Sequence, residues 1–522
     1  MLYSSFEFLF LRNKPFIDTT LNLNTMSKNF SRREFIQKSA IATAGVIAAS
    51  SSLLASVSGT NPVKNKKAPS TKKLNVVGIG VGGRGGAVIS ELAGENILAL
   101  CDVDWKYASK KFKEFPNAKL YKDYRLMFAE IGDQIDAVVI GTADHTHAVI
   151  AAQALAMGKH VYCEKPLTHT VYETRLLTKL AKKQKVATQM GNQGASGEGV
   201  RKTCEAIWSG MIGEVTKVEA FTDRPIWPQG LETPKSVDIP NPELDWNLFI
   251  GPAKFRPFNE IYHPWNWRGW WDFGTGALGD MACHILQPVV QALTLNSPTS
   301  VQGSSTNLMV DSAPNAQIVK YIFPARDNMP RVSMPQVEVT WYDGGLMPEY
   351  PKGWPVGKNM NDGGGAVIFH GTKDTLICGC YGANPWLISG RQMPTPTMTR
   401  EVPEHNHIKD FSRACKESAE DRVLTASDFS HSGPLNEMVV MGVMAVRLQG
   451  LNRELKWDGE KMCFTNINPD DTIKIKIKDG FSIKEGHPSF NNEYTAPINA
   501  LAFANEMIRH TYQNGYSLPE MP

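Results

Sequence analysis

Residues 74–85, LNVVGIGVGGRG, decide the fold of this chain. Leu74 to Ile79 is a short apolar run typical of a buried parallel strand, and it leads directly into a glycine-rich turn followed by Arg84. The turn has the spacing G-x-G-x-x-G, with its glycines at Gly78, Gly80 and Gly83. Residues 87–92 then favour a helix. Such glycines let backbone N–H groups approach a pyrophosphate at a helix N-terminus, so the stretch predicts a dinucleotide site.

The alternation of strand and helix continues beyond this turn. Apolar runs expected as strands lie at 97–101, 136–140, 160–163 and 187–189, and helices are expected at 146–157 and 171–184. This order predicts a doubly wound parallel sheet of the Rossmann type over residues 74–193.

Asp102 ends the second apolar run, about twenty residues beyond the glycine turn, where an acid binds the adenosine ribose hydroxyls. A carboxylate there repels a 2′-phosphate, so NAD is favoured over NADP. The nearby Lys106, Lys110 and Lys111 leave NADP open.

Several motifs together resemble the Gfo/Idh/MocA family (glucose–fructose oxidoreductase, inositol dehydrogenase and rhizopine catabolism proteins). They are the glycine turn, Cys101-Asp102-Val103-Asp104, Thr142-Ala143-Asp144-His145-Thr146-His147, Glu164-Lys165-Pro166 and Asp280-x-x-x-His284. The resemblance covers most of the chain after residue 73 and implies that Lys165, Asp280 and His284 are catalytic. The expected cofactor contacts are Gly78, Gly80, Gly83, Arg84, Asp102, Thr142, His147, Glu164, Lys165 and Asn192. Of these, His147 is expected to order its loop rather than to perform chemistry.

The three catalytic candidates make chemical sense as residue types. Asp280 and His284 are four residues apart, so on a helix they share one face, and a carboxylate beside an imidazole fixes its tautomer. His284 would take the proton of a hydroxyl while a hydride leaves the same carbon, and Lys165 would stabilise the developing alkoxide. The alternative is that the Asp–His pair is a structural hydrogen bond and Lys165 a loop residue.

Residues 194–522 are expected to form an α+β domain with a large, mainly antiparallel sheet, as the family implies. Helices are expected at 200–209 and 437–448, and strands at 214–221, 337–341 and 366–370. The alternating stretch Ile473 to Lys478 predicts an exposed edge strand protected by its lysines.

Residues 262–271, YHPWNWRGWW, are rich in tryptophan. Aromatic faces stack on the C–H faces of sugars, while Arg, His and Asn bind hydroxyls; core packing is expected to claim about half of these side chains. The substrate-site candidates are Arg224, Tyr262, His263, Trp267 and Arg268. Residues 244–252 and the Trp-Arg-Gly-Trp-Trp run look like the exported branch of the family, which implies saccharide metabolism.

The first 73 residues are expected to be a leader, an export signal and a linker. Ser31-Arg32-Arg33-Glu34-Phe35 precedes an apolar, small-residue stretch, a pattern typical of a twin-arginine signal at about 26–59. A Sec-type or amphipathic N-terminus is the alternative. The signal predicts export to the periplasm through the twin-arginine machinery, and hence a tightly held cofactor. No cysteine follows the apolar run, so no stable membrane anchor is expected.

Composition excludes several other functions. The net charge is +3, with 55 basic and 52 acidic residues, and no long basic run suggests a nucleic-acid partner. None of the 8 cysteines forms a C-x-x-C pair, so buried free thiols are expected rather than disulfides or a metal site. The family implies a homo-oligomer.

Three functions follow from this reading. The leading one is an NAD(P)-dependent oxidoreductase that transfers hydride between a nicotinamide cofactor and a hydroxyl of a sugar, polyol or glycoside. The second is an NAD-dependent glycosidase or lyase that acts through transient 3-keto oxidation, without net redox change. The third is a non-catalytic sugar sensor, which the presence of Lys165, Asp280 and His284 argues against.

Overall fold

The computed structural model describes residues 70–239, 241–327, 329 and 333–522. The predicted twin-arginine signal lies outside these residues. The first part of the described chain is a parallel sheet of six strands in the order β3-β2-β1-β4-β5-β6. Its strands are β1 (Asn75–Ile79), β2 (Asn96–Cys101), β3 (Lys119–Tyr121), β4 (Ala137–Ile140), β5 (His160–Cys163) and β6 (Thr188–Met190). This is the predicted doubly wound sheet.

Helices connect these strands; those at 84–91, 144–156 and 171–184 were predicted, and those at 105–114 and 124–131 were not. They are α2 (Arg84–Glu91), α3 (Trp105–Glu114), α4 (Tyr124–Ile131), α5 (Asp144–Ala156) and α6 (Val171–Gln184). β1 lies between β2 and β4, so the strand order reverses there, and the carboxyl ends of β1 and β4 flank the crevice in which such sheets bind ligands. β3 was not predicted, because it has only 3 residues and none of them is fully buried.

The second sheet has nine strands in the order β13-β12-β11-β7-β10-β9-β8-β14-β15. β7 and β10 are parallel, and every other neighbouring pair is antiparallel. The strands are β7 (Val215–Thr222), β8 (Ser300–Ser305), β9 (Gln317–Phe323), β10 (Val337–Tyr342), β11 (Gly365–Gly371), β12 (Thr375–Gly379), β13 (Trp386–Leu387), β14 (Leu455–Asp458) and β15 (Cys463–Phe464). The predicted α+β domain with a mainly antiparallel sheet is thus confirmed.

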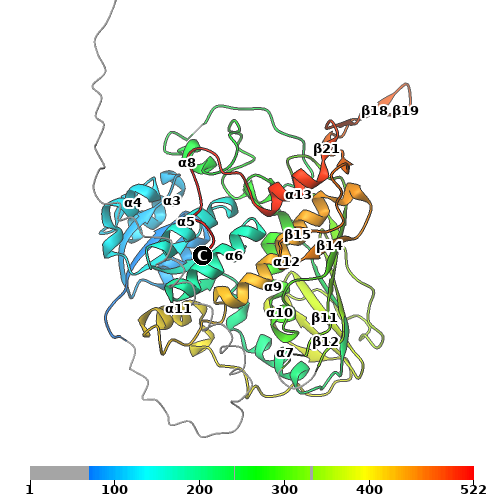
Figure 1. Cartoon of the computed structure of the whole chain (residues 1–522), viewed down its shortest axis with the longest axis horizontal. Coiled ribbons are helices and arrows are strands. Elements are labelled where there is room, and N and C mark those ends of the chain that lie inside the picture. The colour runs from blue at the N-terminus through cyan, green and yellow to red at the C-terminus, as the bar shows by residue number, and fades with distance from the viewer. Residues whose placement is uncertain (1–69, 240, 328, 330–332) are drawn as a thin grey trace, which may run out of the picture. The chain divides into compact units, whose positions relative to one another are not determined.

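Helices pack on one face of this sheet and join it to the first (Figure 1). They include α7 (Glu198–Trp208), α9 (Gly276–Ile285), α10 (Gln287–Ala292) and α12 (Phe429–Arg447), with α8 (Trp246–Ile250) and α11 (His407–Lys416) elsewhere in the chain. α12 begins eight residues before the predicted helix, because the Asp428 side chain caps it by accepting from Ser430 N. One continuous apolar core runs from Val77 in β1 to Val339 in β10.

The predicted exposed edge strand at Ile473 to Lys478 is confirmed only in part, because the stretch forms short strands of two separate two-stranded sheets. It is divided between β16 (Thr472–Ile473), paired with β21 (Ile498–Asn499), and β17 (Lys476–Lys478), paired with β20 (Glu493–Tyr494). Ile473 and Ile475 are only 3% and 5% exposed and belong to the core. One side of the stretch therefore packs on the core, while Lys474 and Lys478 are exposed.

All eight cysteines are free thiols, and all but Cys463 are buried, as predicted. Within the described part of the chain, no helix combines the length and apolarity that crossing a membrane requires.

Candidate active site

A cavity of about 990 Å³ opens at the carboxyl ends of the parallel strands. Its wall combines the glycine turn after β1, Asp102 after β2, Thr142 after β4, and Glu164 and Lys165 after β5 with residues of the second domain. α9 contributes Asp280 and His284. The structure thus brings most of the predicted cofactor residues and all three predicted catalytic residues to one cavity.

The glycine turn has the geometry of a phosphate cradle. Gly80 has a φ of +77°, and a Cβ at this position would lie 2.6 Å from the backbone nitrogen of Thr142. Gly83 precedes α2, whose first turn has no side-chain cap, and both Gly82 and Gly83 line the cavity. Backbone N–H groups at an uncapped helix N-terminus favour an anion, so these residues fit a dinucleotide pyrophosphate.

Asp102 is fixed against this turn. Its Oδ2 accepts hydrogen bonds from Val81 N at 2.8 Å and Gly82 N at 2.9 Å, and its Oδ1 accepts from Asp104 N at 3.0 Å. Burial raises the pKa of Asp102, and these three backbone donors act in the opposite direction. The carboxylate remains part of the cavity wall, where it can accept hydrogen bonds from ribose hydroxyls.

Arg84 and Glu164 join the glycine turn to the end of β5. Arg84 Nε lies 3.3 Å from Glu164 Oε1, and the Glu164 side chain is 7% exposed. Burial raises the pKa of Glu164, while the charges of Arg84 and Lys165 oppose this effect. Both residues line the cavity as predicted.

Lys165, Asp280 and Arg268 form the charged centre of the site. Lys165 Nζ donates to Asp280 Oδ1 at 2.7 Å and to the Asp280 carbonyl oxygen at 2.8 Å, and Arg268 Nε donates to the same Oδ1 at 3.0 Å. The three side chains are 13–16% exposed. Burial alone would raise the pKa of Asp280, but the two cations hold it well below its ordinary range. Asp280 is therefore an anion that orients two cations toward the cavity.

His284 is buried beside this cluster, 5% exposed, and does not pair with Asp280. Its Nδ1 has no hydrogen-bond partner among the described residues, and its ring lies 4.7 Å, centre to centre, from that of Tyr381. The expected Asp280–His284 hydrogen bond is absent from the described contacts, because the carboxylate is oriented by Lys165 and Arg268. Burial, and then the charge of Lys165, hold the pKa of His284 well below its ordinary value, so the imidazole is neutral and can accept a proton.

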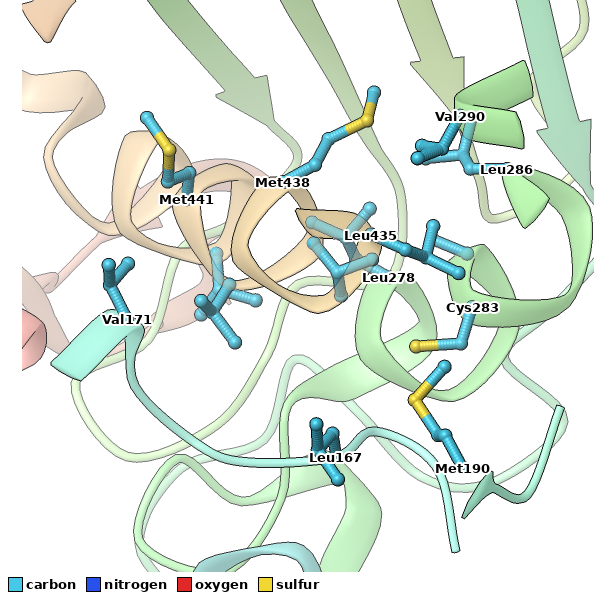
Figure 2. Close-up of a cluster of buried hydrophobic side chains, with 14 of the residues drawn as sticks. Leu167, Val171, Met190, Leu278, Cys283, Leu286, Val290, Leu435, Met438 and Met441 are labelled. Atoms are coloured by element: carbon cyan, nitrogen blue, oxygen red, sulfur yellow. The ribbon is translucent and has the colours of Figure 1, made fainter. Parts of the chain in front are cut away.

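An apolar core supports the catalytic segments from behind. Figure 2 shows Leu278 and Cys283 of α9 close to Leu435 of α12, with Leu167, two residues after Lys165, below them. Leu167, Leu278 and Leu435 are completely buried. Because Asp280 lies on the same helix as Leu278 and Cys283, this core fixes both partners of the Lys165–Asp280 ion pair.

The cavity end beyond this cluster suits a hydroxylated substrate. The Arg268 guanidinium lies over the rings of both Trp265 and Trp267, at 4.0 and 4.3 Å from their centres. Arg224 and Trp227 also line the wall. Of the predicted substrate residues, Arg224, Trp267 and Arg268 therefore lie where they were expected.

Four of the predicted contacts, Gly78, His147, Asn192 and Tyr262, are not part of the cavity wall. Tyr262, 2% exposed, packs edge-on against Trp270 in the aromatic core, and its hydroxyl accepts from Arg256. His263 does line the cavity, but its Nε2 lies 3.0 Å from Asp104 Oδ2, two residues after the predicted ribose-binding Asp102.

Asn192 and His147 are fully or almost fully buried and are not part of the cavity wall. Asn192 Nδ2 donates to Gln287 Oε1 at 2.7 Å, so it joins the two domains rather than contacting the cofactor. His147 Nδ1 and Nε2 face the carbonyl oxygens of Pro166 and Thr142, at 2.8 and 3.1 Å. His147 therefore orders two cavity loops, as expected.

Sequence reasoning missed Tyr107 and Tyr381. A Cβ at Gly82 would lie 2.2 Å from Tyr107 Cδ1, so this tyrosine covers the glycine turn. Tyr381 lines the cavity with a φ of +63°, a left-handed conformation that is uncommon for non-glycine residues. No sequence motif marks either residue.

Two family models match the chain. Residues 72–192 match "Oxidoreductase family, NAD-binding Rossmann fold", and residues 197–324 match "Oxidoreductase family, C-terminal alpha/beta domain", both of the GFO_IDH_MocA family. The two matches fall on the two sheets described above.

Individual proteins are similar over parts of their length. An uncharacterized oxidoreductase of Schizosaccharomyces pombe is 38% identical over 117 residues, which are 22% of this chain and 31% of that protein. The alpha-N-acetylgalactosaminidase of Shewanella oneidensis is 28% identical over 288 residues, 51% of this chain and 56% of that protein. The chain thus spans 31% and 56% of the lengths of these two relatives.

A solved structure shares the fold. The WlbA dehydrogenase from Chromobacterium violaceum, in complex with NADH and UDP-GlcNAcA, is 15% identical with a TM-score of 0.51, covering 76% of this chain and 99% of that one. Residues 72–192 and 197–324 thus match the two domains of the Gfo/Idh/MocA oxidoreductase family, and the structure shares the fold of this dehydrogenase.

Proposed function

We propose that the protein is an NAD-dependent oxidoreductase that transfers hydride between its cofactor and a hydroxyl-bearing carbon of a sugar, polyol or glycoside. One observation carries the proposal. A single cavity joins the glycine turn and Asp102 at one end to the Lys165–Asp280–Arg268 cluster, His284 and two tryptophans at the other. A dinucleotide and a hydroxylated substrate can therefore meet beside a base and a cation.

The chain's own residues would perform the proton chemistry. An ammonium has three N–H donors, and Lys165 gives two to Asp280, so one is left for the oxygen of a substrate. The neutral imidazole of His284 would accept the hydroxyl proton as the carbonyl forms. Asp280 holds Lys165 in place, and Trp265 and Trp267 offer faces to the C–H surface of a sugar. Bound NAD would supply the hydride acceptor.

The first test is to denature the purified protein and identify the released small molecules by mass spectrometry. The native protein is then mixed with a sugar panel while the absorbance of reduced nicotinamide is followed. We expect bound NAD, reduction by at least one sugar, and loss of that reduction in Lys165→Ala and His284→Ala. The control His370→Ala removes a histidine that is bonded to Glu219 on the large sheet, outside the cavity wall, and should leave reduction unchanged. Absence of dinucleotide binding would contradict the proposal and favour a sugar sensor.

A second candidate is an NAD-dependent glycosidase or lyase. The similarity to the Shewanella oneidensis alpha-N-acetylgalactosaminidase, over 51% of this chain, favours it. Oxidation at C3 of a glycoside would acidify the C2–H bond, and loss of that proton with departure of the alcohol from C1 would break the glycosidic bond. Water would then add to C1 and a solvent proton to C2, and the hydride would return to C3. This reaction predicts cleavage of a nitrophenyl glycoside without accumulation of reduced nicotinamide. In D₂O, deuterium should enter the carbon next to the oxidised one, whereas a simple dehydrogenase should leave that carbon unlabelled.

We also propose that the protein is exported to the periplasm with its cofactor tightly bound and acts as a homo-oligomer. The Arg32-Arg33 pair supports export. Asp102 supports the binding of NAD rather than NADP. Cell fractionation of the Arg32→Lys, Arg33→Lys double variant should show the protein retained in the cytoplasm. An unchanged periplasmic fraction would contradict twin-arginine export.

A further inference from the structure

Residues 509–522 return from the second domain to the Rossmann domain. After α13 (Ala500–Ile508), the segment passes α8 and ends near the parallel sheet (Figure 1). Three successive residues attach it by hydrogen bonds: Tyr512 Oη donates to Glu173 Oε1, Gln513 N donates to Pro252 O at 3.0 Å, and Asn514 Nδ2 donates to Gly251 O at 2.8 Å. The path of the segment is therefore fixed along its length.

A tight turn directs the next side chain. Asn514 and Gly515 have φ values of +58° and +76°, and Tyr516 N donates to Gln513 O at 3.0 Å. Positive φ at both central positions is the requirement of a type I′ turn, for which Asn-Gly is the favoured pair. The turn brings Tyr516 to the wall of the large cavity.

The Tyr516 ring is held there from behind. The Arg125 guanidinium lies over it at 4.8 Å from the ring centre. Arg125 is itself fixed by Asp123, with Nη2 2.6 Å from Oδ2 and Nε 2.9 Å from Oδ1. The cation on one face therefore holds the ring in a fixed orientation, and the other face remains an apolar surface.

The position of Tyr516 corresponds to one part of a dinucleotide. In this fold the pyrophosphate lies over the glycine turn and the adenosine ribose on the acid after β2, here Asp102. Tyr516 lines the cavity together with Asp102 and with Lys122, Asp123 and Tyr124, which follow β3. In the strand order this wall lies on the β3 side of Asp102, whereas Lys165 follows β5 at the other end of the cavity, so the wall lies toward the adenosine end of a bound dinucleotide.

We propose that Tyr516 forms an aromatic wall against the adenine of the cofactor, and that residues 509–522 are a strap that retains the dinucleotide. The inference rests on the proposed binding of NAD. Every nucleobase has a face that stacks on an aromatic ring, so the strap recognises the adenosine half and not the nicotinamide half. A strap anchored on the second domain would also slow the release of the cofactor.

The test compares the affinities of NAD, AMP and nicotinamide mononucleotide for cofactor-stripped full-length protein by calorimetry. Tyr516→Ala should weaken NAD and AMP by on the order of tenfold and leave the mononucleotide unchanged. Tyr516→Phe keeps the ring and should bind all three like the wild type. The control is Tyr494→Ala, which removes a 52% exposed tyrosine of β20 outside this cavity.

The outcomes separate this inference from the proposed function. Wild-type affinity for NAD in Tyr516→Ala overturns the strap and leaves NAD binding intact. Equal weakening of AMP and the mononucleotide overturns the assignment to adenine, because it indicates a general loosening. If the wild type binds none of the three ligands, the proposed function and the strap both fail. Deletion of residues 512–522, in protein that still folds by circular dichroism, should speed NAD dissociation, and an unchanged rate contradicts retention.

Discussion

Replacing Asp280 with asparagine is the most informative perturbation of the site. The variant keeps an oxygen that can accept hydrogen bonds but removes the charge that holds Lys165 at 2.7 Å and Arg268 at 3.0 Å. Hydrogen bonds to charged groups contribute roughly 1.5–3 kcal/mol each, and the amide retains part of that, so we take about 3 kcal/mol for the pair. All three side chains are mostly buried, so little of this is screened by solvent.

If Lys165 loses its orientation, it stabilises the alkoxide that develops in the transition state less well, so the free-energy cost appears in kcat. A cost of about 3 kcal/mol corresponds to roughly a 10²-fold decrease in kcat. The Kd of NAD should change less than about threefold, because the glycine turn and Asp102 contact neither Asp280 nor Arg268. The assay is reduction of NAD by the most active sugar of the panel, with NAD binding measured separately.

Asp410→Asn is the matched control. Asp410 also holds two cations, Arg400 at 2.7 Å and Arg413 at 3.0 Å, but it lies on α11 outside the cavity wall. It should lower stability by a similar amount and leave kcat within about twofold. Wild-type kcat in Asp280→Asn, or an equal loss of kcat in Asp410→Asn, would refute the role assigned to this cluster.

Three further predictions concern the base and the dinucleotide end. Because the pKa of His284 lies well below its ordinary 6.5, the pH profile of kcat/KM should show no acid-side step near pH 6.5, and a step there would contradict a neutral base. Gly80→Ala places a Cβ 2.6 Å from Thr142 N and should weaken NAD binding by on the order of tenfold. The control is Gly158→Ala: Gly158 has a similar φ of +71°, but its added Cβ would have no atom within 4 Å, so this variant should only lower thermal stability. Asp102→Asn should weaken NAD about tenfold and reduce its preference over NADP, as titration with both cofactors would show; an unchanged preference would exclude Asp102 as the discriminating group.

The dinucleotide half could be predicted because its signals are local. Strand, glycine turn and helix are contiguous, and Asp102 follows from a fixed distance along one βα unit. The same locality explains the error at Asp280. The spacing to His284 suggested a partner four residues away, but the carboxylate pairs with Lys165, 115 residues away in sequence. Tertiary contacts of this kind have no periodic signature.

The aromatic run shows the second limit. Trp267 lines the cavity, whereas Trp270 is completely buried, and Tyr262 packs against Trp270 in the core. These residues lie in turns and a 3-10 segment, so neither helical nor strand periodicity separates inward from outward side chains. Tyr381 and Tyr516 were missed for a related reason. Tyr381 itself has a left-handed backbone conformation, and Tyr516 directly follows two residues that have one. Both residues line the cavity and lie far in sequence from every motif.

The central claim is that hydride passes between a substrate carbon and bound NAD. The direct measurement is to offer the most active sugar in fully C-deuterated form and to determine the mass of the dinucleotide released from the protein. The account predicts reduced dinucleotide that carries one deuterium, and none in Lys165→Ala or His284→Ala. Reduced dinucleotide without deuterium, or protein that holds no dinucleotide at all, would contradict it.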